Sequence, residues 1–243
     1  MKTVLITGCS SGFGLETARY FLEHDWKVIA TMRTPREDVL PRSEHLRVLA
    51  LDVTDPHSIR QVIEAAGPID VLVNNAGIGM LGALEGTPME TARSVFETNT
   101  LGTIAMTQAV LPQFRQRKAG TVVNVTSSVT LKSLALLSVY TASKAAINAF
   151  TESLALELQP FNIRVSLVLP GRAPETRFGE NAQARILIPE AYANLAQSVF
   201  AQWAQSSEVT LSRDVAEAVW RAATDPAAPL RMVAGADALA LVG

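Results

Sequence analysis

Residues 3–14 read TVLITGCSSGFG, and this stretch decides the fold. The largely apolar run 3–7 predicts a strand, Gly8, Gly12 and Gly14 predict a turn, and apolar residues at helical spacing predict a helix after it. A strand, a glycine turn and a helix in this order form a cradle for phosphate. The glycines let the backbone approach a pyrophosphate, and the free N–H groups of the first helical turn point at its charge. The spacing is G-x-x-x-G-x-G, and not the G-x-G-x-x-G of the general dinucleotide fingerprint.

Apolar runs of strand length alternate with helical patterns along the chain. The expected strands are 3–7, 26–31, 46–51, 69–73, 121–126, 164–169 and 230–234, and the expected helices lie near 14–24, 57–66, 90–117, 140–158 and 212–223. This alternation is typical of a parallel sheet with helices on both faces. We therefore predict an α/β fold: a single doubly wound Rossmann-type domain over 1–243 with a mainly parallel seven-stranded sheet. The segment 172–210 is too long for a simple turn, and we expect it to be a substrate loop or lid.

Composition is that of an ordinary soluble globule: 48% of the 243 residues are hydrophobic and 18% are charged. The formal net charge is −2 and there is no basic run, so nucleic acid is not an expected partner. Apolar runs are too short for a membrane span or a leader peptide. The lone cysteine, Cys9, cannot form an internal disulfide, which fits a reducing compartment. We expect a cytoplasmic protein, and no metal site, because no Cys/His/Asp cluster has ligand spacing.

A tyrosine and a lysine stand four residues apart in the run VYTASK at 139–144. On a helix this spacing places Tyr140 and Lys144 on one face. The ammonium favours the phenolate, and a second positive charge such as an oxidised nicotinamide ring would add to the effect. The tyrosine would then donate and accept a proton near neutral pH. Such a pair is common in helices, and it gains weight only from the glycine turn at the other end of the chain.

Further short motifs occur in order between and after these two features. They are LDV at 51–53, NNAG at 74–77, TNTLG at 98–102, NVTSS at 124–128 and Pro170-Gly171 after the run 165–169. Together with the glycine turn and the Tyr140/Lys144 pair, this set resembles the short-chain dehydrogenase/reductase family in its short form. The match extends over nearly the whole chain. It implies hydride transfer between a nicotinamide cofactor and an alcohol or ketone.

The resemblance implies a role for each catalytic residue. Tyr140 would be the general acid and base, and Ser127 would hold the substrate oxygen. Lys144 would bind the nicotinamide ribose and bias the pKa of Tyr140, and Asn99 would hold a water that links Lys144 to solvent. Ser128 is the rival to Ser127, because neighbours on a strand point to opposite faces and only one can reach the substrate. We predict Ser127.

The cofactor is expected to contact residues from all of these motifs. The resemblance assigns Asp52 and Val53 to the adenine ring and the segment 75–77 to the ribose and nicotinamide, although Asp52 is equally well explained as a turn residue after a strand. Relatives commonly place a threonine four residues after the Pro-Gly glycine, and here Thr176 comes one residue late. The predicted contacts are Gly8, Ser10, Ser11, Gly12, Phe13, Gly14, Arg33, Asp52, Val53, Asn75, Ala76, Gly77, Tyr140, Lys144, Pro170, Gly171 and Thr176.

The end of the second strand bears on cofactor choice. NAD-preferring folds of this kind place an acid there to bind the ribose hydroxyls, and the run WKVIATMR at 26–33 contains none. Arg33 stands there instead, and its guanidinium would bind a 2′-phosphate, with Ser10 and Ser11 as added donors. The alternative is that Arg33 is a solvated loop residue. We predict NADP(H), with NAD(H) as the alternative.

The substrate is expected to be an apolar alcohol or ketone. The runs TGCSSG at 7–12 and TMR at 31–33 are similar to the hydroxysteroid and retinol branch of the family. Two apolar sets would line the pocket, although ordinary burial explains either set nearly as well. They are Phe178, Ile186, Leu187, Ile188, Tyr192, Leu195, Val199, Phe200 and Trp203, and Val129, Leu131, Leu134, Leu136 and Leu137.

Two other functions fit the same fold less well. A non-catalytic dinucleotide-binding regulator would need only the nucleotide cradle, whereas this chain keeps all four catalytic residues. An epimerase or dehydratase of the extended branch would usually be longer.

Apolar residues spread around much of the helix 140–158. They predict a homodimer or homotetramer built on that helix and on 90–117.

Overall fold

The computed structural model describes residues 1–36, 38–176, 186–205 and 207–242. Seven strands form one sheet in the order β3-β2-β1-β4-β5-β6-β7, and each neighbouring pair is parallel. This confirms the predicted Rossmann-type sheet. The strands are β1 (Thr3–Ile6), β2 (Lys27–Met32), β3 (Leu46–Ala50), β4 (Val71–Asn74), β5 (Gly120–Val125), β6 (Ile163–Pro170) and β7 (Arg231–Ala234).

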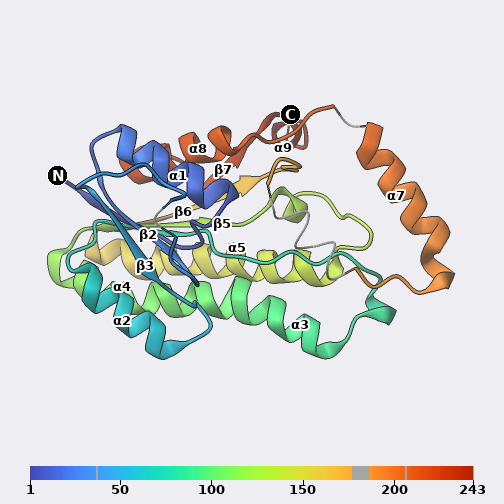
Figure 1. Cartoon of the computed structure of the whole chain (residues 1–243), viewed down its shortest axis with the longest axis horizontal. Helices are drawn as coiled ribbons and strands as arrows, with labels where there is room; N and C mark the ends of the chain where they lie inside the picture. The colour runs from blue at the N-terminus through green and yellow to red at the C-terminus, as the bar shows by residue number, and fades with distance from the viewer. Residues whose placement is uncertain (37, 177–185, 206, 243) are drawn as a thin grey trace.

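Helices cover both faces of the sheet (Figure 1). On one face lie α1 (Gly12–Glu23) and α8 (Ser212–Thr224), and on the other lie α2 (Pro56–Ala66), α3 (Met89–Phe96), α4 (Gly102–Arg117) and α5 (Ser138–Leu158). Strand β1 shows how the sequence produces this arrangement. Val4 and Ile6 belong to the apolar cluster with α1 and α8, whereas Leu5 belongs to the cluster with α2, α4 and α5. Alternate side chains of a strand point to opposite faces, so a fully apolar strand needs helices on both sides.

The segment 90–117 was predicted as one helix, and the structure divides it. Between α3 and α4 lies one π-helical stretch, η2 (Glu97–Leu101), which contains Asn99. The side chain of Asn99 turns toward the loop after β4, where Oδ1 accepts from the N–H of Ile78 at 2.8 Å and Nδ2 donates to its carbonyl at 3.0 Å. Such stretches are frequent at functional sites. Asn99, a predicted site residue, thus lies in this π-helical turn and is hydrogen-bonded to the loop after β4.

The segment 172–210 contains a helix that the sequence patterns did not reveal, α7 (Ala193–Gln205), preceded by the short η5 (Glu190–Tyr192). Figure 1 shows α7 projecting at one end of the molecule. Ala196 and Val199 of α7 pack in an apolar cluster with Leu81 and Leu136. Residues 177–185 of the expected lid, with Phe178 among them, lie outside the described part of the chain.

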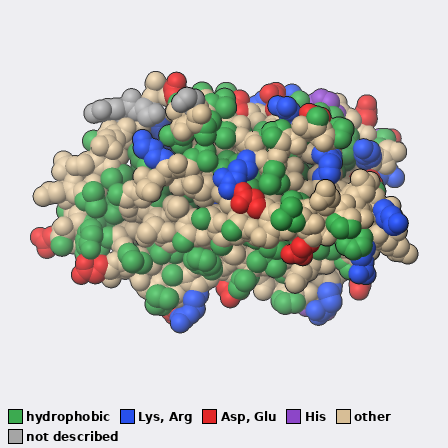
Figure 2. Space-filling model, turned by 180° about the vertical axis from the view of Figure 1, so that it is seen from behind, with side chains coloured by type: hydrophobic (Ala, Val, Ile, Leu, Met, Phe, Trp, Pro, Cys, Tyr) green, Lys and Arg blue, Asp and Glu red, His purple; other side chains and the backbone are tan. Residues whose placement is uncertain are grey.

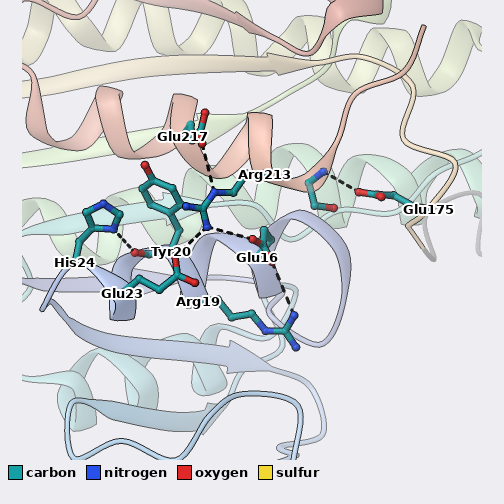
Figure 3. Close-up of polar contacts among 9 residues, drawn as sticks. Glu16, Arg19, Tyr20, Glu23, His24, Glu175, Arg213 and Glu217 are labelled. Carbon is teal, nitrogen blue, oxygen red and sulfur yellow. Dashed lines mark hydrogen bonds and ion pairs between the residues drawn. The ribbon is translucent and has the colours of Figure 1, made fainter. Parts of the chain in front are cut away.

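Helix α8 fixes α1, the helix that opens at the glycine turn. Arg213 lies 3.6 Å from Glu16, 2.9 Å from Glu23 and 3.3 Å from Glu217, and its guanidinium carbon is 4.1 Å from the ring centre of Tyr20. Figure 3 shows Arg213 among these side chains. All of these groups are partly exposed, so we expect each ion pair to contribute little to the stability of the fold. The contacts mainly fix the position of α8 along α1.

The surface matches the composition. Figure 2 shows acidic and basic side chains interspersed with hydrophobic ones over the back of the molecule. Within the described ranges, no helix is both long and apolar enough to cross a membrane.

Candidate active site

The predicted site residues converge on one cleft of about 1340 Å³ at the carboxyl ends of the strands. Parallel strands place the loops that follow them at one edge of the sheet, which is where ligands bind in such folds. Sixteen of the seventeen predicted cofactor contacts line the cleft, and so does Ser127; Gly14 and Asn99 lie behind its wall. The lining contacts are Gly8, Ser10, Ser11, Gly12, Phe13, Arg33, Asp52, Val53, Asn75, Ala76, Gly77, Tyr140, Lys144, Pro170, Gly171 and Thr176.

The glycine turn has the shape that a pyrophosphate requires. Gly8 and Gly12 have φ values of +75° and +57°, in the left-handed region that side chains disfavour. A Cβ on Gly14 would lie 2.4 Å from the Gly8 carbonyl oxygen, so only glycine permits this approach. The Ser11 side chain makes no capping hydrogen bond, and the first turn of α1 carries no acid. The N–H groups at this helix end therefore suit an anion, and these residues fit a dinucleotide phosphate.

The asparagine of the NNAG motif braces the turn. Asn75 Nδ2 donates to the carbonyl oxygens of Thr7 at 2.9 Å and Gly8 at 3.2 Å. In return, Thr7 Oγ1 accepts the N–H groups of Asn75 and Ala76 at 3.0 and 2.9 Å. Asn75 was predicted as a cofactor contact, and it lines the cleft while also tying β1 to β4. The part of Thr7 in this brace was not predicted, because a threonine at the end of a strand carries no distinctive pattern.

Asn74 points away from the cleft. Its Nδ2 donates to Asn124 Oδ1 at 2.9 Å and to Thr107 Oγ1 at 3.1 Å. It is a buried link between β4, β5 and α4.

At the other end of the cleft, Arg33 and Asp52 face each other. Hydrogen bonds from the N–H and hydroxyl of Thr54 hold the pKa of Asp52 below its usual value, with a smaller contribution from the Arg33 guanidinium. Asp52 therefore has the turn role considered for it, and it also lines the cleft. Arg36 belongs to none of the sequence motifs, and its Nη2 donates to the carbonyl of Ser10 in the glycine turn at 2.8 Å. The Arg33 side chain is exposed, so it is accessible to the phosphate group of a cofactor that binds from solution.

Tyr140 and Ser127 are brought together by α5 and the end of β5. Both are buried, at 6% and 8% exposure, and their side chains are hydrogen-bonded. Burial raises the pKa of Tyr140 above its ordinary value, and the hydrogen bond with Ser127 offsets part of this rise. Proximity to Lys144 was expected to lower the pKa, so for the protein's own groups that expectation is wrong. The reason is that burial disfavours the phenolate more than the neighbouring groups stabilise it.

Lys144 lies one helical turn beyond Tyr140 and is 5% exposed. Its Nζ donates to the carbonyl oxygen of Val125 at the end of β5, at 3.1 Å. Burial lowers the pKa of Lys144 to about 8. A Cβ on Gly77 would lie 3.4 Å from Nζ and 3.2 Å from Asn99 Oδ1, so the glycine lets the backbone after β4 approach both side chains.

Asn99 contacts the helix of Tyr140 from behind. Its Nδ2 donates to the Ser143 hydroxyl at 3.1 Å, and that hydroxyl in turn donates to the Tyr140 carbonyl at 2.7 Å. Asn99 is 1% exposed. It therefore links η2, the loop after β4 and α5, the three elements that meet behind Tyr140 and Lys144.

The turn after β6 is held by residues near the end of the chain. The N–H of Arg172 donates to Asp237 Oδ2 at 2.6 Å, and the N–H of Gly171 donates to Thr210 Oγ1 at 2.9 Å. Thr176 is buried, and its Cβ would be 3.2 Å from a Cβ on Gly12. Thr176 thus lies against the phosphate end of the cleft. Glu175, beside it, accepts the N–H of Ser212 at 2.8 Å, which ties this loop to the start of α8 (Figure 3).

The remaining end of the cleft is apolar. Of the residues expected there, Val129, Leu134, Leu137, Ile186, Phe200 and Trp203 line it, joined by Met80, Leu81 and Leu241. Leu136, Ile188, Tyr192 and Val199 pack behind this wall instead, as ordinary burial would have it. Among the described residues, no group of three or more His, Cys, Asp or Glu side chains could hold a metal ion.

The chain is similar to known sequences. A family model described as short chain dehydrogenase matches residues 2–186. Retinol dehydrogenase 8 of Bos taurus is 43% identical over 185 residues, which cover 70% of this chain and 58% of that protein. The 3-ketodihydrosphingosine reductase of Bacteroides thetaiotaomicron is 41% identical over 174 residues, covering 70% and 63%. These matches thus span less than two thirds of the length of either relative.

Solved structures resemble the chain over almost its full length. A short-chain dehydrogenase from Streptomyces avermitilis superposes with a TM-score of 0.84 at 34% identity, covering 99% of this chain and 90% of that one. A serine dehydrogenase in complex with NADP+ gives 0.83 at 28%, covering 97% and 95%. A 3-ketoacyl-(acyl-carrier-protein) reductase from Brucella melitensis in complex with NADH gives 0.78 at 25%, covering 96% and 94%. Structures of this fold thus bind either nicotinamide cofactor.

Proposed function

Since this chain belongs to the short-chain dehydrogenase/reductase family of oxidoreductases, we propose that it is an NADP(H)-dependent carbonyl reductase/alcohol dehydrogenase for apolar substrates, with Tyr140 as general acid and base. One observation carries the proposal. The hydrogen-bonded pair Ser127 and Tyr140 lies in the same cleft as the glycine turn, with Lys144 one helical turn away. A proton donor, an oxygen-binding hydroxyl and a phosphate cradle are thus combined in one site.

A reduced nicotinamide ring supplies the hydride when it is bound. The protein's part is to bind and protonate the substrate oxygen. Ser127 and Tyr140 donate hydrogen bonds to the carbonyl oxygen, and Tyr140 gives its proton to that oxygen as the carbon becomes tetrahedral. The raised pKa of Tyr140 keeps the phenol protonated at neutral pH, which suits reduction. Oxidation of an alcohol uses the same groups in reverse, with Tyr140 as the base.

Lys144 and Asn99 support this pair. With a pKa of about 8, Lys144 is an ammonium at neutral pH, and it favours the phenolate that forms as the proton leaves. We assign it to the nicotinamide ribose hydroxyls as well. Asn99, whose amide is bonded to Ile78 and Ser143, would hold the water that connects Lys144 to solvent.

The preference for NADP(H) is supported by charge. Arg33 lines the cleft after β2, where no acid stands, and Arg36 contacts Ser10 in the adjacent turn. We propose that Arg33 binds the 2′-phosphate with the hydroxyls of Ser10 and Ser11, and that Arg36 adds positive charge beside them. An NAD-linked enzyme is the alternative, because one solved neighbour is in complex with NADH and another is in complex with NAD.

The apolar end of the cleft supports the substrate class. Met80, Leu137, Phe200 and Trp203 give the cleft a large apolar surface, and Ser94, Glu97, Ser128 and Lys132 line it as well. Relatives are named for retinol and for 3-ketodihydrosphingosine, both largely hydrocarbon. We propose a carbonyl compound with a long or polycyclic apolar body.

We also make proposals about the catalytic unit, the oligomer and the cellular location of the protein. We propose that 1–243 acts as one catalytic unit with 172–210 as a lid, since α7 supplies Phe200 and Trp203 to the cleft. A homodimer or homotetramer would cover α4 and α5. The cytoplasm is proposed as its location because the only cysteine, Cys9, is a buried free thiol.

A substrate panel tests the proposal. NADPH oxidation is followed with retinaldehyde, 3-ketodihydrosphingosine, a 17-ketosteroid and 9,10-phenanthrenequinone, each with and without protein. We expect at least one to be reduced, and small polar ketones to be poorer substrates. Tight NADPH binding without reduction of any of them would favour a non-catalytic nucleotide-binding regulator.

A further inference from the structure

Asn148 lies on the same face of α5 as Tyr140 and Lys144, in the series i, i+4, i+8. All three side chains are buried, and Asn148 is 5% exposed. Its Nδ2 donates a hydrogen bond of 2.9 Å to the Thr130 hydroxyl. Asn148 therefore reaches from the helix of Tyr140 to the segment that follows Ser127.

Thr130 extends this contact to Ser127. Its hydroxyl donates to the Ser127 carbonyl oxygen at 2.9 Å, and its N–H approaches the same oxygen at 3.3 Å. Because the hydroxyl accepts from Asn148 and donates to Ser127, amide, hydroxyl and carbonyl form one polarised chain. Ser127 is thus held at its backbone through Thr130 and Asn148, and at its hydroxyl by Tyr140.

We infer that Asn148 and Thr130 are positioning residues that fix the Ser127 hydroxyl relative to Tyr140, an inference that rests on the function proposed above. Tyr140 and Asn148 both lie on α5, so the position of Ser127 depends on the helix that carries the tyrosine. At the start of the short helix that follows it, the Ser127 hydroxyl also accepts the N–H of Val129 at 3.3 Å. Asn148 Oδ1 is buried and has no hydrogen-bond partner among the described residues. A leucine would fill similar space without burying that oxygen, so what the asparagine adds is its donor to Thr130.

Substitutions at Thr130 separate the hydroxyl from the shape of the side chain. Thr130→Val keeps the shape and removes the hydroxyl, whereas Thr130→Ser keeps the hydroxyl. We expect Thr130→Val and Asn148→Leu to lower kcat about tenfold or more in the carbonyl panel, with the KM for NADPH unchanged, because a small displacement of a catalytic group slows the chemical step. Thr130→Ser should restore kcat. Loss of kcat in both Thr130 variants alike would overturn the inference.

Thr107→Val is the matched control. Thr107 on α4 likewise accepts from an asparagine, Asn74, and donates to a backbone carbonyl, that of Thr103. It is 1% exposed, whereas Thr130 is half-buried, and it does not line the cleft. It should lower stability without a fall in kcat. An equal fall in kcat in Thr107→Val and Thr130→Val would make the effect a general loss of stability and overturn the inference.

A double-mutant cycle and hydrogen exchange complete the test. In a Ser127→Ala background, Thr130→Val should have no further effect on kcat; a full additional loss would show that Thr130 does not act through Ser127. Amides of 129–131 should exchange faster in Thr130→Val and Asn148→Leu, and not in Thr107→Val. Unchanged exchange would overturn the inference. If the wild type reduces no carbonyl compound, the proposed function fails. Hydrogen exchange alone then still decides whether Asn148 and Thr130 hold the segment after Ser127.

Discussion

Lys144 Nζ lies 3.1 Å from the carbonyl oxygen of Val125, so the ammonium on α5 is bound to the last residue of β5. Ser127 stands two residues farther along the same strand end. The contact therefore joins the helix of the proposed acid to the segment of the proposed oxygen-binding serine. It also places a cation where solvent cannot stabilise it, which gives Lys144 its lowered pKa.

The first prediction concerns Lys144 and stability. Its pKa is about 8 in the folded protein, against an ordinary value of 10.5 for a solvated lysine, so between these values the unfolded chain binds more protons. The free energy of unfolding should therefore rise with pH from about 8 to 10.5. Lys144→Met removes this rise. The free energy of unfolding of the variant minus that of the wild type should therefore be about 1–3 kcal/mol more positive at pH 7 than at pH 10.

Urea unfolding at the two pH values measures the difference. The lost hydrogen bond to Val125 affects both values alike and cancels. Lys132→Met is the matched control, because this lysine is exposed at the cleft. A stability difference between Lys144→Met and wild type that does not change with pH would contradict the buried-ammonium account.

The second prediction separates two neighbouring serines. Ser127 is hydrogen-bonded to Tyr140, whereas Ser128 begins the short helix η3 (Ser128–Thr130). Ser127→Ala should lower kcat about a hundredfold, because it removes a donor to the reacting oxygen. Ser128→Ala should lower it much less. Steady-state kinetics with the best carbonyl substrate measure both, and the reverse order would show that Ser128 binds the substrate oxygen.

The third prediction concerns the cofactor. NADPH should bind roughly ten- to hundredfold more tightly than NADH, the range expected for charge-assisted hydrogen bonds to the 2′-phosphate. Arg33→Ala should narrow the gap, and Arg36→Ala should also narrow it, because Arg36 contacts the turn residue Ser10. Arg19→Ala is the control, since Arg19 donates to Val39 on the flank of α1. Calorimetric titration that finds equal affinities in the wild type would reject the NADP preference.

The fourth prediction concerns assembly. Leu156 on α5 is 74% exposed and Leu101, between α3 and α4, is 49% exposed, on the two helices expected to form the interface. Light scattering at micromolar protein should give a dimer or tetramer mass. Leu156→Glu should shift it toward monomer, whereas Leu239→Glu, at another exposed leucine on α9 (Ala236–Leu239), should not. A monomer mass for the wild type would refute the assembly.

Local patterns predicted most elements of this fold, because each strand is a short, largely apolar run and most helices carry apolar residues at helical spacing. The seven strands were all found, with ends within two residues. The missed features depend on contacts distant in sequence. The π-helical turn at Asn99 accompanies hydrogen bonds to Ile78, and α7 is stabilised by packing against Leu81 and Leu136, neither of which a local pattern contains.

The same distinction applies to the site. The family resemblance predicted one site for Ser127, Tyr140 and Lys144, and all three line the same cleft. The supporting contacts of Thr7, Arg36 and Asp237 were not foreseen, because threonine, arginine and aspartate at loop positions are common and gain meaning only from their partners. A lowered pKa was expected for Tyr140 with Lys144 and an oxidised nicotinamide ring beside it. With the protein's own groups alone its pKa is raised, since sequence spacing shows a neighbouring charge and not the degree of burial.

The most direct test of the proposed chemistry is single-turnover reduction of the best panel carbonyl, with the wild type and Tyr140→Phe, by NADPH that carries deuterium at both hydrogen positions of nicotinamide C4. The substitution keeps the ring and removes only the proton donor. We predict deuterium on the carbinol carbon with the wild type, and in Tyr140→Phe a rate at least about a hundredfold lower with NADPH affinity unchanged. Turnover by Tyr140→Phe within a few-fold of the wild type, or product without deuterium, would contradict the account.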